Sequence, residues 1–197
     1  MRERYPQLVL ASASPRRAAL LTQLGLVFTV NFLDIDESRR ADETAIAMVQ
    51  RLALTKARVV AHGEILPVLG ADTVVVVDDV PLGKPIDRDD GVSMLTQLSG
   101  RGHDVLTAVA LVQDSKSEVR LSRSRVFFRE ISQSEAQAYW LSGEPRDKAG
   151  GYGIQGIGGI FAQRIEGSYS GIVGLPLAET EALLQAFGVD TWRYRGV

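Results

Sequence analysis

The feature that most constrains the fold is the run LPVLGADTVVVV at residues 66–77, where one carboxylate interrupts a series of apolar side chains. The run predicts a long strand, because apolar and β-branched residues dominate it and a turn follows at Asp78–Asp79. Asp72 is the exception, since a carboxylate inside such a strand is costly unless it is paired, hydrogen-bonded or bound to a metal. It is either a functional group, as a metal ligand or a base, or a buried aspartate that caps a turn after Gly70.

The remaining pattern alternates helices with strands near both ends of the chain and places strands in succession in the middle. The expected strands are 7–12, 26–32, 66–77, 104–112, 118–129, 160–165 and 168–173. The expected helices are 15–24, 44–61, a short helix between Asp87 and Gly100, 133–142, and a last helix from Pro176 to Gly188. This order favours an α/β fold with a mixed, elongated, twisted sheet flanked by helices. No linker or repeat divides the chain, so residues 1–197 are expected to form one domain of two lobes on a continuous sheet.

The composition excludes several classes of protein. Cysteine is absent, which excludes disulfides, zinc–thiolate sites, iron–sulfur clusters and thiol nucleophiles. No apolar run approaches the roughly 18 residues that a membrane span needs, and the N-terminal MRERYPQLVL lacks the apolar region of a signal peptide. We therefore expect a cytoplasmic protein that has no membrane partner.

The net charge of −2 gives no overall electrostatic reason for binding to nucleic acid. The local exception is the segment KSEVRLSRSRVFFR at residues 116–129, where alternation places Arg123, Arg125 and Arg129 on one side of a strand. A solvated face is the ordinary explanation for such a row, so nucleic acid is not the partner that we expect.

Familiar motifs do not explain the chain. GYGIQG at residues 151–156 matches GxGxxG, but it precedes a strand instead of following one and opening a helix, so it does not predict a dinucleotide site. Neither His62 nor His103 lies in a His–Asp or HExxH pattern, and both are expected to be structural. A GxSxG nucleophile turn is also absent.

Residues 10–17, LASASPRR, join a strand to a helix and put two cations in the first turn of that helix. Ser14 fits the N-cap and Pro15 the first helical position, so Arg16 and Arg17 are the second and third helical residues. The helix dipole disfavours cations there, whereas the free backbone N–H groups of the same turn favour an anion. With Ser12 close by, the segment is either a cradle for phosphate or a surface arginine pair that bridges to neighbouring acids.

Two lysines and a group of acids complete the unusual charges. Lys56 borders the apolar stripe of its helix and would ordinarily extend its ammonium group to solvent, while Lys84 lies on the tight loop PLGKP. The cluster Asp34, Asp36 and Glu37 is either a solvated acidic loop or a set of oxygen ligands, which suit Mg²⁺ or Mn²⁺. Taken with the arginines, these groups suggest metal-assisted work on a phosphoanhydride, in which a carboxylate orients the attacking water or accepts its proton.

These residues resemble the Maf family of nucleoside triphosphate pyrophosphatases over nearly the whole chain, from about Leu8 to Leu184. The matching motifs are LASASPRR (10–17), DIDE (34–37), LALTKA (52–57), GADTVV (70–75), GKP (83–85), DKAGGYGIQG (147–156) and GSYSGIVGLP (167–176). Their shared order along the chain makes the resemblance specific.

The resemblance implies hydrolysis of a nucleoside triphosphate between its α- and β-phosphates, which gives a monophosphate and pyrophosphate. It also implies a divalent cation (Mg²⁺ or Mn²⁺), an ITPase-like fold with a central cleft between two lobes, and a homodimer. Asp72 matches the family's proposed general base and, with Glu37, a carboxylate near the metal. The residues that match the phosphate site are Ser12, Arg17, Lys56 and Lys84, and we count both lysines with Asp72 as catalytic.

One branch of the family, similar to the dTTP/UTP pyrophosphatases, carries Arg, Thr and Gln at three specificity positions. These positions match Arg16, Thr73 and Gln155, and a glutamine amide offers both a donor and an acceptor to a pyrimidine edge. The implied substrates are therefore dTTP, UTP and modified pyrimidine triphosphates. The alternative is a nucleotide- or nucleic-acid-binding regulator, because the family is associated with cell division and septum formation.

Overall fold

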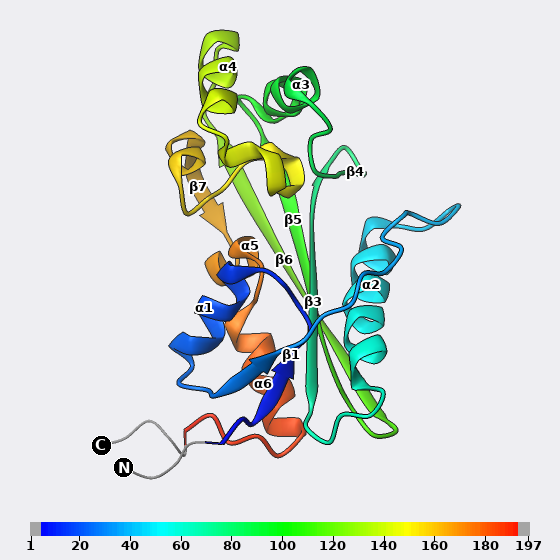
Figure 1. The fold of residues 1–197 in the computed structure, drawn as a ribbon. Coiled ribbons are helices and arrows are strands. Elements are labelled where there is room, and N and C mark those ends of the chain that lie inside the picture. Colours follow the sequence, from blue (N-terminus) through cyan, green and yellow to red (C-terminus); the bar gives the residue numbers. More distant parts are fainter. Residues whose placement is uncertain (1–4, 193–197) are drawn as a thin grey trace.

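A seven-stranded sheet forms the centre of the molecule, and the structure, a computed structural model, describes residues 5–192 (Figure 1). The strands lie in the order β2 (Phe28–Val30), β1 (Leu8–Leu10), β3 (Val68–Val77), β5 (Gly102–Gln113), β6 (Lys116–Phe128) and β7 (Ala162–Glu166), and β4 (Val80–Leu82) pairs with β3. β1 runs parallel to β2 and β3, whereas the other pairs are antiparallel. The predicted mixed α/β sheet is confirmed.

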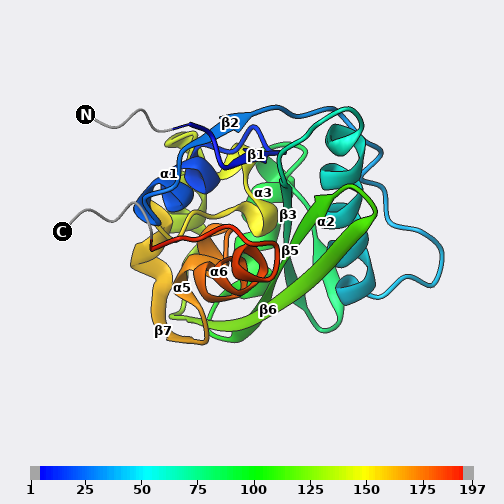
Figure 2. The ribbon, with the colours of Figure 1, turned by 90° about the horizontal axis from the view of Figure 1, so that it is seen from below.

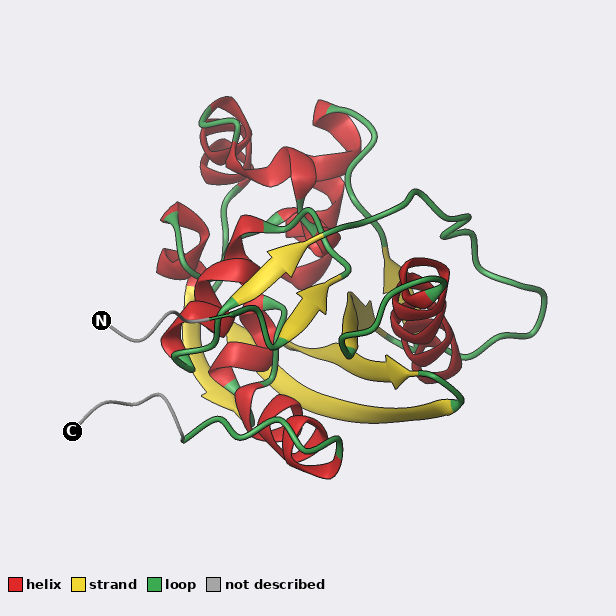
Figure 3. Ribbon diagram, turned by 60° about the horizontal axis from the view of Figure 1, so that its bottom comes forward, coloured by secondary structure: helices red, strands yellow, loops and turns green. Residues whose placement is uncertain are grey.

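Helices cover both faces of this sheet. They are α1 (Pro15–Gln23), α2 (Ala45–Ala61), α3 (Arg88–Leu98), α4 (Gln133–Leu141), α5 (Tyr169–Val173) and α6 (Leu177–Ala186), with the 3₁₀ turns η1 (Glu144–Asp147), η2 (Ala149–Gly151) and η3 (Ile157–Phe161). Figure 2 shows α2 on one side of β3 and β5 and α5 and α6 on the other, and Figure 3 shows the sheet in yellow between them.

Local sequence explains where these helices begin. The predicted N-cap Ser14 accepts a hydrogen bond from the backbone N–H of Arg17, and Asp87 accepts one from that of Asp90. Ser132 and Glu135 form a complete capping box at the start of α4. Each such cap contributes about 1 kcal/mol to the stability of its helix.

The apolar side chains form clusters on both faces of the sheet. The cluster under α2 includes Val49, Ala53, Ala57, Val74 and Leu106. On the opposite face, one cluster lies around α1 and α6 and includes Leu10, Leu21, Leu69 and Leu183, and another reaches α3 and α4 and includes Val75, Leu95, Val126 and Tyr139. Successive residues of β3 point to opposite faces, so this strand contributes to all three clusters.

One predicted strand is wrong, because residues 168–173 form the short helix α5. The Ser168 side chain accepts a hydrogen bond from the Gly171 backbone N–H at 3.0 Å, which caps the helix, and Gly174 at φ 125° ends it. The chain has already turned away from β7 at Gly167, where φ is 105°. The capped turn therefore replaces a further ladder of strand hydrogen bonds.

β3, β5 and β6 are the longest strands, and elements from both ends of the chain pack against them (Figure 1). Within the described residues, no helix has the length and apolar character that crossing a membrane requires. The single domain over residues 1–197, the two lobes and the central cleft stay predictions, and residues 1–4 and 193–197 lie outside the described part.

Candidate active site

The site begins where α2 lies directly on β3. A Cβ atom at Gly70 would stand 2.3 Å from the backbone oxygen of Ala53 and 2.7 Å from the backbone nitrogen of Ala57, so only glycine permits this approach. Gly70 and Asp72 share a face of the strand, and Lys56 precedes Ala57 on the helix. The close approach therefore brings the Lys56 ammonium group to the Asp72 carboxylate.

Lys56 forms ion pairs with two carboxylates. Its Nζ atom lies 2.7 Å from Oδ1 of Asp72 and 2.6 Å from Oε1 of Glu37, which comes from the loop between β2 and α2. Only 16% of the Lys56 side chain is exposed, so the ammonium group does not extend to solvent as its place on the helix had suggested. Asp72 lies inside the continuous strand β3 and does not cap a turn after Gly70.

Burial and charge act in opposite directions on these acids. Burial raises the pKa of Asp72 above its ordinary value, although the charges of Lys56 and Arg17 act to lower it. Burial also opposes ionisation of Glu37, but the hydrogen bond and charge of Lys56, with the charges of Lys84 and Arg17, lower its pKa overall. The site thus contains one ionised acid and one whose pKa is moved towards neutral pH.

Arg17 extends from α1 into the interior and donates hydrogen bonds to three groups. Its Nε donates to the carbonyl oxygen of Gly174 at 2.9 Å, Nη1 to Ser12 Oγ at 3.1 Å, and Nη2 to Thr73 Oγ1 at 3.3 Å. Burial lowers the pKa of Arg17, but a guanidinium group stays cationic at neutral pH. One cation therefore joins three elements, which are the first turn of α1, β3 and the end of α5.

Thr73 also belongs to a chain of hydroxyl groups. The Thr107 Oγ1 atom lies 3.0 Å from Thr73 Oγ1 and 2.7 Å from the carbonyl oxygen of Gly171. A guanidinium group only donates and a carbonyl only accepts, so the proton of Thr73 is directed to Thr107 and that of Thr107 to Gly171. The hydroxyl of Thr73 is left able to accept a hydrogen bond from a ligand but not to donate one.

The other predicted site residues lie further out. Arg16 Nη1 is 3.3 Å from Asp147 Oδ2, so this arginine bridges to the segment that follows α4. Lys84 is exposed, and the effect of its charge on Glu37 places it on the same side of the site. Gln155 is exposed and has no hydrogen bond among the described residues. The structure therefore forms two sets of direct contacts, Arg17 with Ser12 and Thr73, and Lys56 with Asp72 and Glu37. Asp72 and Thr73 are neighbours on β3 and connect the two sets. Arg16, Lys84 and Gln155 have no hydrogen bond or ion pair with either set among the described residues.

The donor set suits a hard divalent cation in part. Glu37 and Asp72 supply carboxylate oxygens, and the Lys56 ammonium group already lies between them, where a positive charge is favoured. Over residues 5–192, no group of three or more His, Cys, Asp or Glu side chains is arranged to hold a metal. Two carboxylates fit the manner in which Mg²⁺ binds, with one or two acids and the phosphate oxygens of a substrate.

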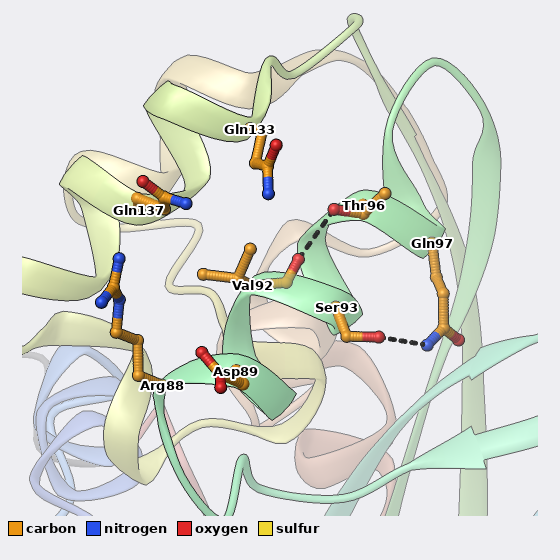
Figure 4. A pocket seen from close by; sticks show the side chains of 8 residues that line it. All are labelled: Arg88, Asp89, Val92, Ser93, Thr96, Gln97, Gln133 and Gln137. Atoms are coloured by element: carbon orange, nitrogen blue, oxygen red, sulfur yellow. Dashed lines mark hydrogen bonds between the residues drawn. The ribbon is translucent and has the colours of Figure 1, made fainter.

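A hollow on the surface lies elsewhere, between α3 and α4 (Figure 4). Neutral amides and hydroxyls form most of its lining, which consists of Arg88, Asp89, Val92, Ser93, Thr96, Gln97, Gln133 and Gln137. It contains no buried ion pair and none of the predicted site residues. The predicted site residues lie instead at the junction of α1, α2 and β3.

Two groups that hold Arg17 and Thr73 were not among the predicted site residues. The hydroxyl of Thr107 comes from the predicted strand 104–112, and the carbonyl oxygen of Gly174 directly follows the segment 168–173 that the sequence predicts as a strand. Gly174 has a signal in retrospect, because a glycine directly before Leu175–Pro176 marks a helix end with positive φ. Thr107 lies in an apolar strand and has no such signal.

Comparison with known proteins relates the chain to a family. A family model described as Maf-like protein matches residues 7–187. A relative from Hahella chejuensis (strain KCTC 2396), named dTTP/UTP pyrophosphatase, is 54% identical over 190 residues, which is 94% of each chain. A relative of the same name from Saccharophagus degradans (strain 2-40 / ATCC 43961 / DSM 17024) is 50% identical over 191 residues, or 94% of this chain and 91% of its own.

Among solved structures, a HAM1 protein from Coxiella burnetii has a TM-score of 0.47 and 18% identity, covering 63% of this chain and 73% of its own. The family model covers far more of the sequence, from the strand before Ser12 to the end of the last helix. By that match and by the two relatives, this chain belongs to the Maf family.

Proposed function

We propose that this protein hydrolyses dTTP and UTP to the monophosphate and pyrophosphate, and that modified pyrimidine triphosphates are also substrates. The two relatives described above are named for this activity and align over nearly the whole chain. The observation that carries the proposal is the Lys56 ion pair with Asp72 and Glu37 beside the buried guanidinium group of Arg17. Cations for a polyphosphate and carboxylates for a water nucleophile meet there.

Asp72 is the proposed general base. Its carboxylate accepts a proton from water while the water oxygen bonds to the α-phosphorus. The bond between the α-phosphorus and the oxygen that bridges to the β-phosphate breaks, and pyrophosphate leaves with that oxygen. Burial raises the pKa of Asp72, which makes it a stronger base than an ordinary aspartate. Lys56 holds the carboxylate in place through the 2.7 Å contact.

Arg17, Ser12 and the free N–H groups of the first turn of α1 form the proposed phosphate cradle. The guanidinium group is already desolvated and fixed by Gly174 and Thr73, so little order has to be created when a phosphate arrives. Lys56 and Lys84 add positive charge from the other side. These donors compensate the charge that spreads over the phosphate oxygens during transfer.

Mg²⁺ or Mn²⁺ is the proposed cofactor, with Glu37 and Asp72 as its protein ligands. When bound, the ion neutralises phosphate charge and lowers the pKa of water. Because only two carboxylates are available, we expect the phosphate oxygens of the substrate to complete its coordination. Oδ1 of Asp72 accepts the hydrogen bond of Lys56, and Oδ2 makes no hydrogen bond among the described residues. Oδ2 is therefore the atom that we propose as the base and as the metal ligand.

Arg16, Thr73 and Gln155 are the proposed specificity residues. Gln155 can donate and accept, and Thr73 can accept from the N3–H group that thymine and uracil share. We also propose a homodimer, on the basis of the family resemblance alone, and a cytoplasmic location, on the basis of the composition.

The test is release of pyrophosphate from dTTP and UTP by the purified protein with Mg²⁺. Asp72→Asn removes the base but keeps the shape, and we expect kcat to fall by roughly 10²–10⁴-fold. Asp89→Asn, at an exposed position on α3, is the matched control and should leave kcat unchanged. Removal of the metal with a chelator should stop turnover, and Mg²⁺ should restore it.

Absence of pyrophosphate with both nucleotides would contradict the proposed function. Full activity of Asp72→Asn would instead contradict the role of this residue, and the activity itself would stand.

A further inference from the structure

Residues 153–158 form the segment that carries Gln155, and it is anchored on both sides of that residue. At one end, the backbone N–H of Gly153 donates to the hydroxyl of Tyr139 at 3.0 Å. At the other end, the backbone N–H groups of Ile157 and Gly158 donate to the Glu144 carboxylate at 2.8 and 3.0 Å. Gln155 lies between these anchors and is itself exposed.

The two anchoring side chains also bind each other. The Tyr139 hydroxyl donates to Oε1 of Glu144 at 2.6 Å, so one continuous set of hydrogen bonds runs from Gly153 to Gly158. Tyr139 is 4% exposed, and its ring packs edge-on against Phe161 at 5.2 Å between centroids. Burial opposes ionisation of Glu144, but its hydrogen bonds from Tyr139, Gly158 and Ile157 outweigh it and lower the pKa. At neutral pH the anchor is a carboxylate that accepts from every group it contacts.

The glycines of this segment are explained by the same contacts. A Cβ at Gly156 would stand 2.1 Å from Oε2 of Glu144, and one at Gly158 would stand 2.6 Å from the Tyr139 hydroxyl oxygen. The match of GYGIQG to a dinucleotide motif is thus incidental, because two of its glycines, Gly153 and Gly156, lie against the Glu144 carboxylate of the protein itself. A side chain at Gly156 would collide with the Glu144 carboxylate, which lies directly against the main chain there.

The anchor is also joined to Arg16. Glu144 begins η1, whose last residue Asp147 accepts a hydrogen bond from Arg16 Nη1 at 3.3 Å. Lys148 Nζ donates to Asp147 Oδ1 and to the Glu144 backbone oxygen, each at 2.7 Å. The four-residue turn therefore connects to two proposed specificity residues, Arg16 through an ion pair and Gln155 through the anchored main chain.

We propose that Glu144 and Tyr139 are positioning residues, which fix the main chain on both sides of Gln155 and so set the nucleobase preference of the site without touching the substrate. The inference rests on the proposed function, in which Gln155 contacts the pyrimidine. It assigns specificity to a carboxylate and a phenol that lie behind the contact residue.

The test compares kcat/KM for dTTP and UTP with that for CTP and GTP in Glu144→Gln. An amide NH₂ group cannot accept the hydrogen bond of the Ile157 N–H, so the anchor is weakened on one side of Gln155. We expect kcat/KM for dTTP and UTP to fall about tenfold, mainly through KM, and that for CTP and GTP to change less than about threefold. The ratio of kcat/KM for dTTP and UTP to kcat/KM for CTP and GTP therefore falls.

Tyr139→Phe is the second variant, because it removes one hydroxyl and keeps the ring in its packing against Phe161. It should narrow the preference in the same direction even if Glu144→Gln folds poorly. Glu130→Gln is the matched control, since Glu130 is exposed and its side chain has no hydrogen bond among the described residues. It should leave both kcat/KM and the preference unchanged.

A double variant decides whether the effect passes through Gln155. If it does, adding Glu144→Gln to Gln155→Ala causes no further loss of preference, whereas independent effects would multiply. A purely structural role would lower the amount of active protein, which reduces all four activities by one factor and leaves the ratios between them unchanged.

An unchanged ratio of kcat/KM for dTTP and UTP to that for CTP and GTP in both Glu144→Gln and Tyr139→Phe, or multiplicative effects in the double variant, would overturn the inference. Wild-type protein that releases no pyrophosphate from dTTP or UTP would instead overturn the proposed function. The two failures are thus told apart by the wild-type measurement.

Discussion

At the residue scale, the Lys56 ammonium group offsets part of the cost of burying the carboxylates of the site. A lone carboxylate in a strand such as β3 would carry a desolvation cost of several kcal/mol, and the ammonium group at 2.7 Å offsets part of it. The offset is incomplete, because burial still raises the pKa of Asp72. A fully compensated aspartate would be a weak base, so the incomplete pairing is what suits Asp72 to proton transfer.

The two neighbouring arginines should behave differently when each is changed. Arg17 is half-buried and donates hydrogen bonds to Ser12, Thr73 and Gly174, so Arg17→Ala removes a cation from the proposed phosphate cradle. We expect kcat/KM for every triphosphate to fall by roughly 10–100-fold, the size of a hydrogen bond to a charged group. Arg16→Ala breaks only the outer pair with Asp147 and should alter the ranking among nucleotides.

Steady-state kinetics with dTTP, UTP, CTP and GTP measure both effects, and thermal unfolding shows how much each variant is destabilised. Arg88→Ala, an exposed arginine on α3, is the control for loss of charge. If both arginine variants lose activity by the same factor on every nucleotide, the division of roles between them is wrong.

His103 should make the stability of the fold depend on pH. Burial lowers its pKa from 6.5 to about 4, and its Nε2 atom lies 2.8 Å from the Tyr152 hydroxyl oxygen. The unfolded chain takes up a proton near pH 6.5 and the folded chain only near pH 4, so the stability is full above 6.5 and is lost as the pH falls through this window. The loss amounts to roughly 3 kcal/mol at most.

Urea unfolding at pH 7 and pH 4.5 measures this loss, with His103→Gln as the comparison because glutamine does not titrate. The carboxylates that titrate in the same range contribute equally to both proteins, so the difference between the two pH dependences isolates the histidine. If the free energy of unfolding falls equally between pH 7 and pH 4.5 in the two proteins, His103 does not cause the pH dependence.

At the scale of elements, periodic and capped segments could be predicted from sequence and the irregular ones could not. The stripe of α2 and the caps at Ser14, Asp87 and Ser132 are local patterns, and the structure places helices there. The helix α5 was predicted as a strand, because a five-residue segment is too short to show a helical period. Its Ser168 cap was the better signal.

The candidate site follows the same division. Asp72 and the arginine pair could be singled out because each breaks a local rule about charge, in a buried strand or at a helix N-terminus. The pairing of Lys56 with Glu37 could not, because it depends on how the loop before α2 folds back over the helix. Glu144 gave no signal either, since an acid after a helix-ending glycine is ordinary, and its contacts form only when residues 153–158 close over it.

On the scale of the whole molecule, the site is assembled by the sheet. β1 and β3 are parallel neighbours, so the turn after β1 carries Ser12 and Arg17 to the side of Asp72 and Thr73. The antiparallel strands continue β3 in the other direction and support the segment that carries Gln155, which packs through Ile154 against both clusters of that face. The proposed phosphate and base contacts therefore come from opposite directions along one sheet, which would fix their separation.

The charges of the molecule argue against the alternative role in binding nucleic acid. Of the three arginines in the predicted row, Arg123 pairs with Asp104 at 2.6 Å, and Arg129 lies beyond the end of β6 and pairs with Glu135 at 2.8 Å. Arg125 remains over the ring of Phe127, and the chain as a whole carries a net charge of −2. Little positive charge is left to release counterions from a phosphate backbone.

Fluorescence anisotropy with a labelled single-stranded oligonucleotide, at low and at physiological salt, tests this conclusion. We expect no binding tighter than about 10⁻⁴ M at physiological salt, the weak end of non-specific affinity, and no change in Arg123→Glu/Arg125→Glu. Arg88→Glu alters the net charge away from the row and serves as the control. Tight binding that weakens steeply with salt, and that only the double variant abolishes, would favour a regulator that binds nucleic acid through this face of β6. The ion pair between Arg123 and Asp104 would then have to break to free Arg123 for the phosphates.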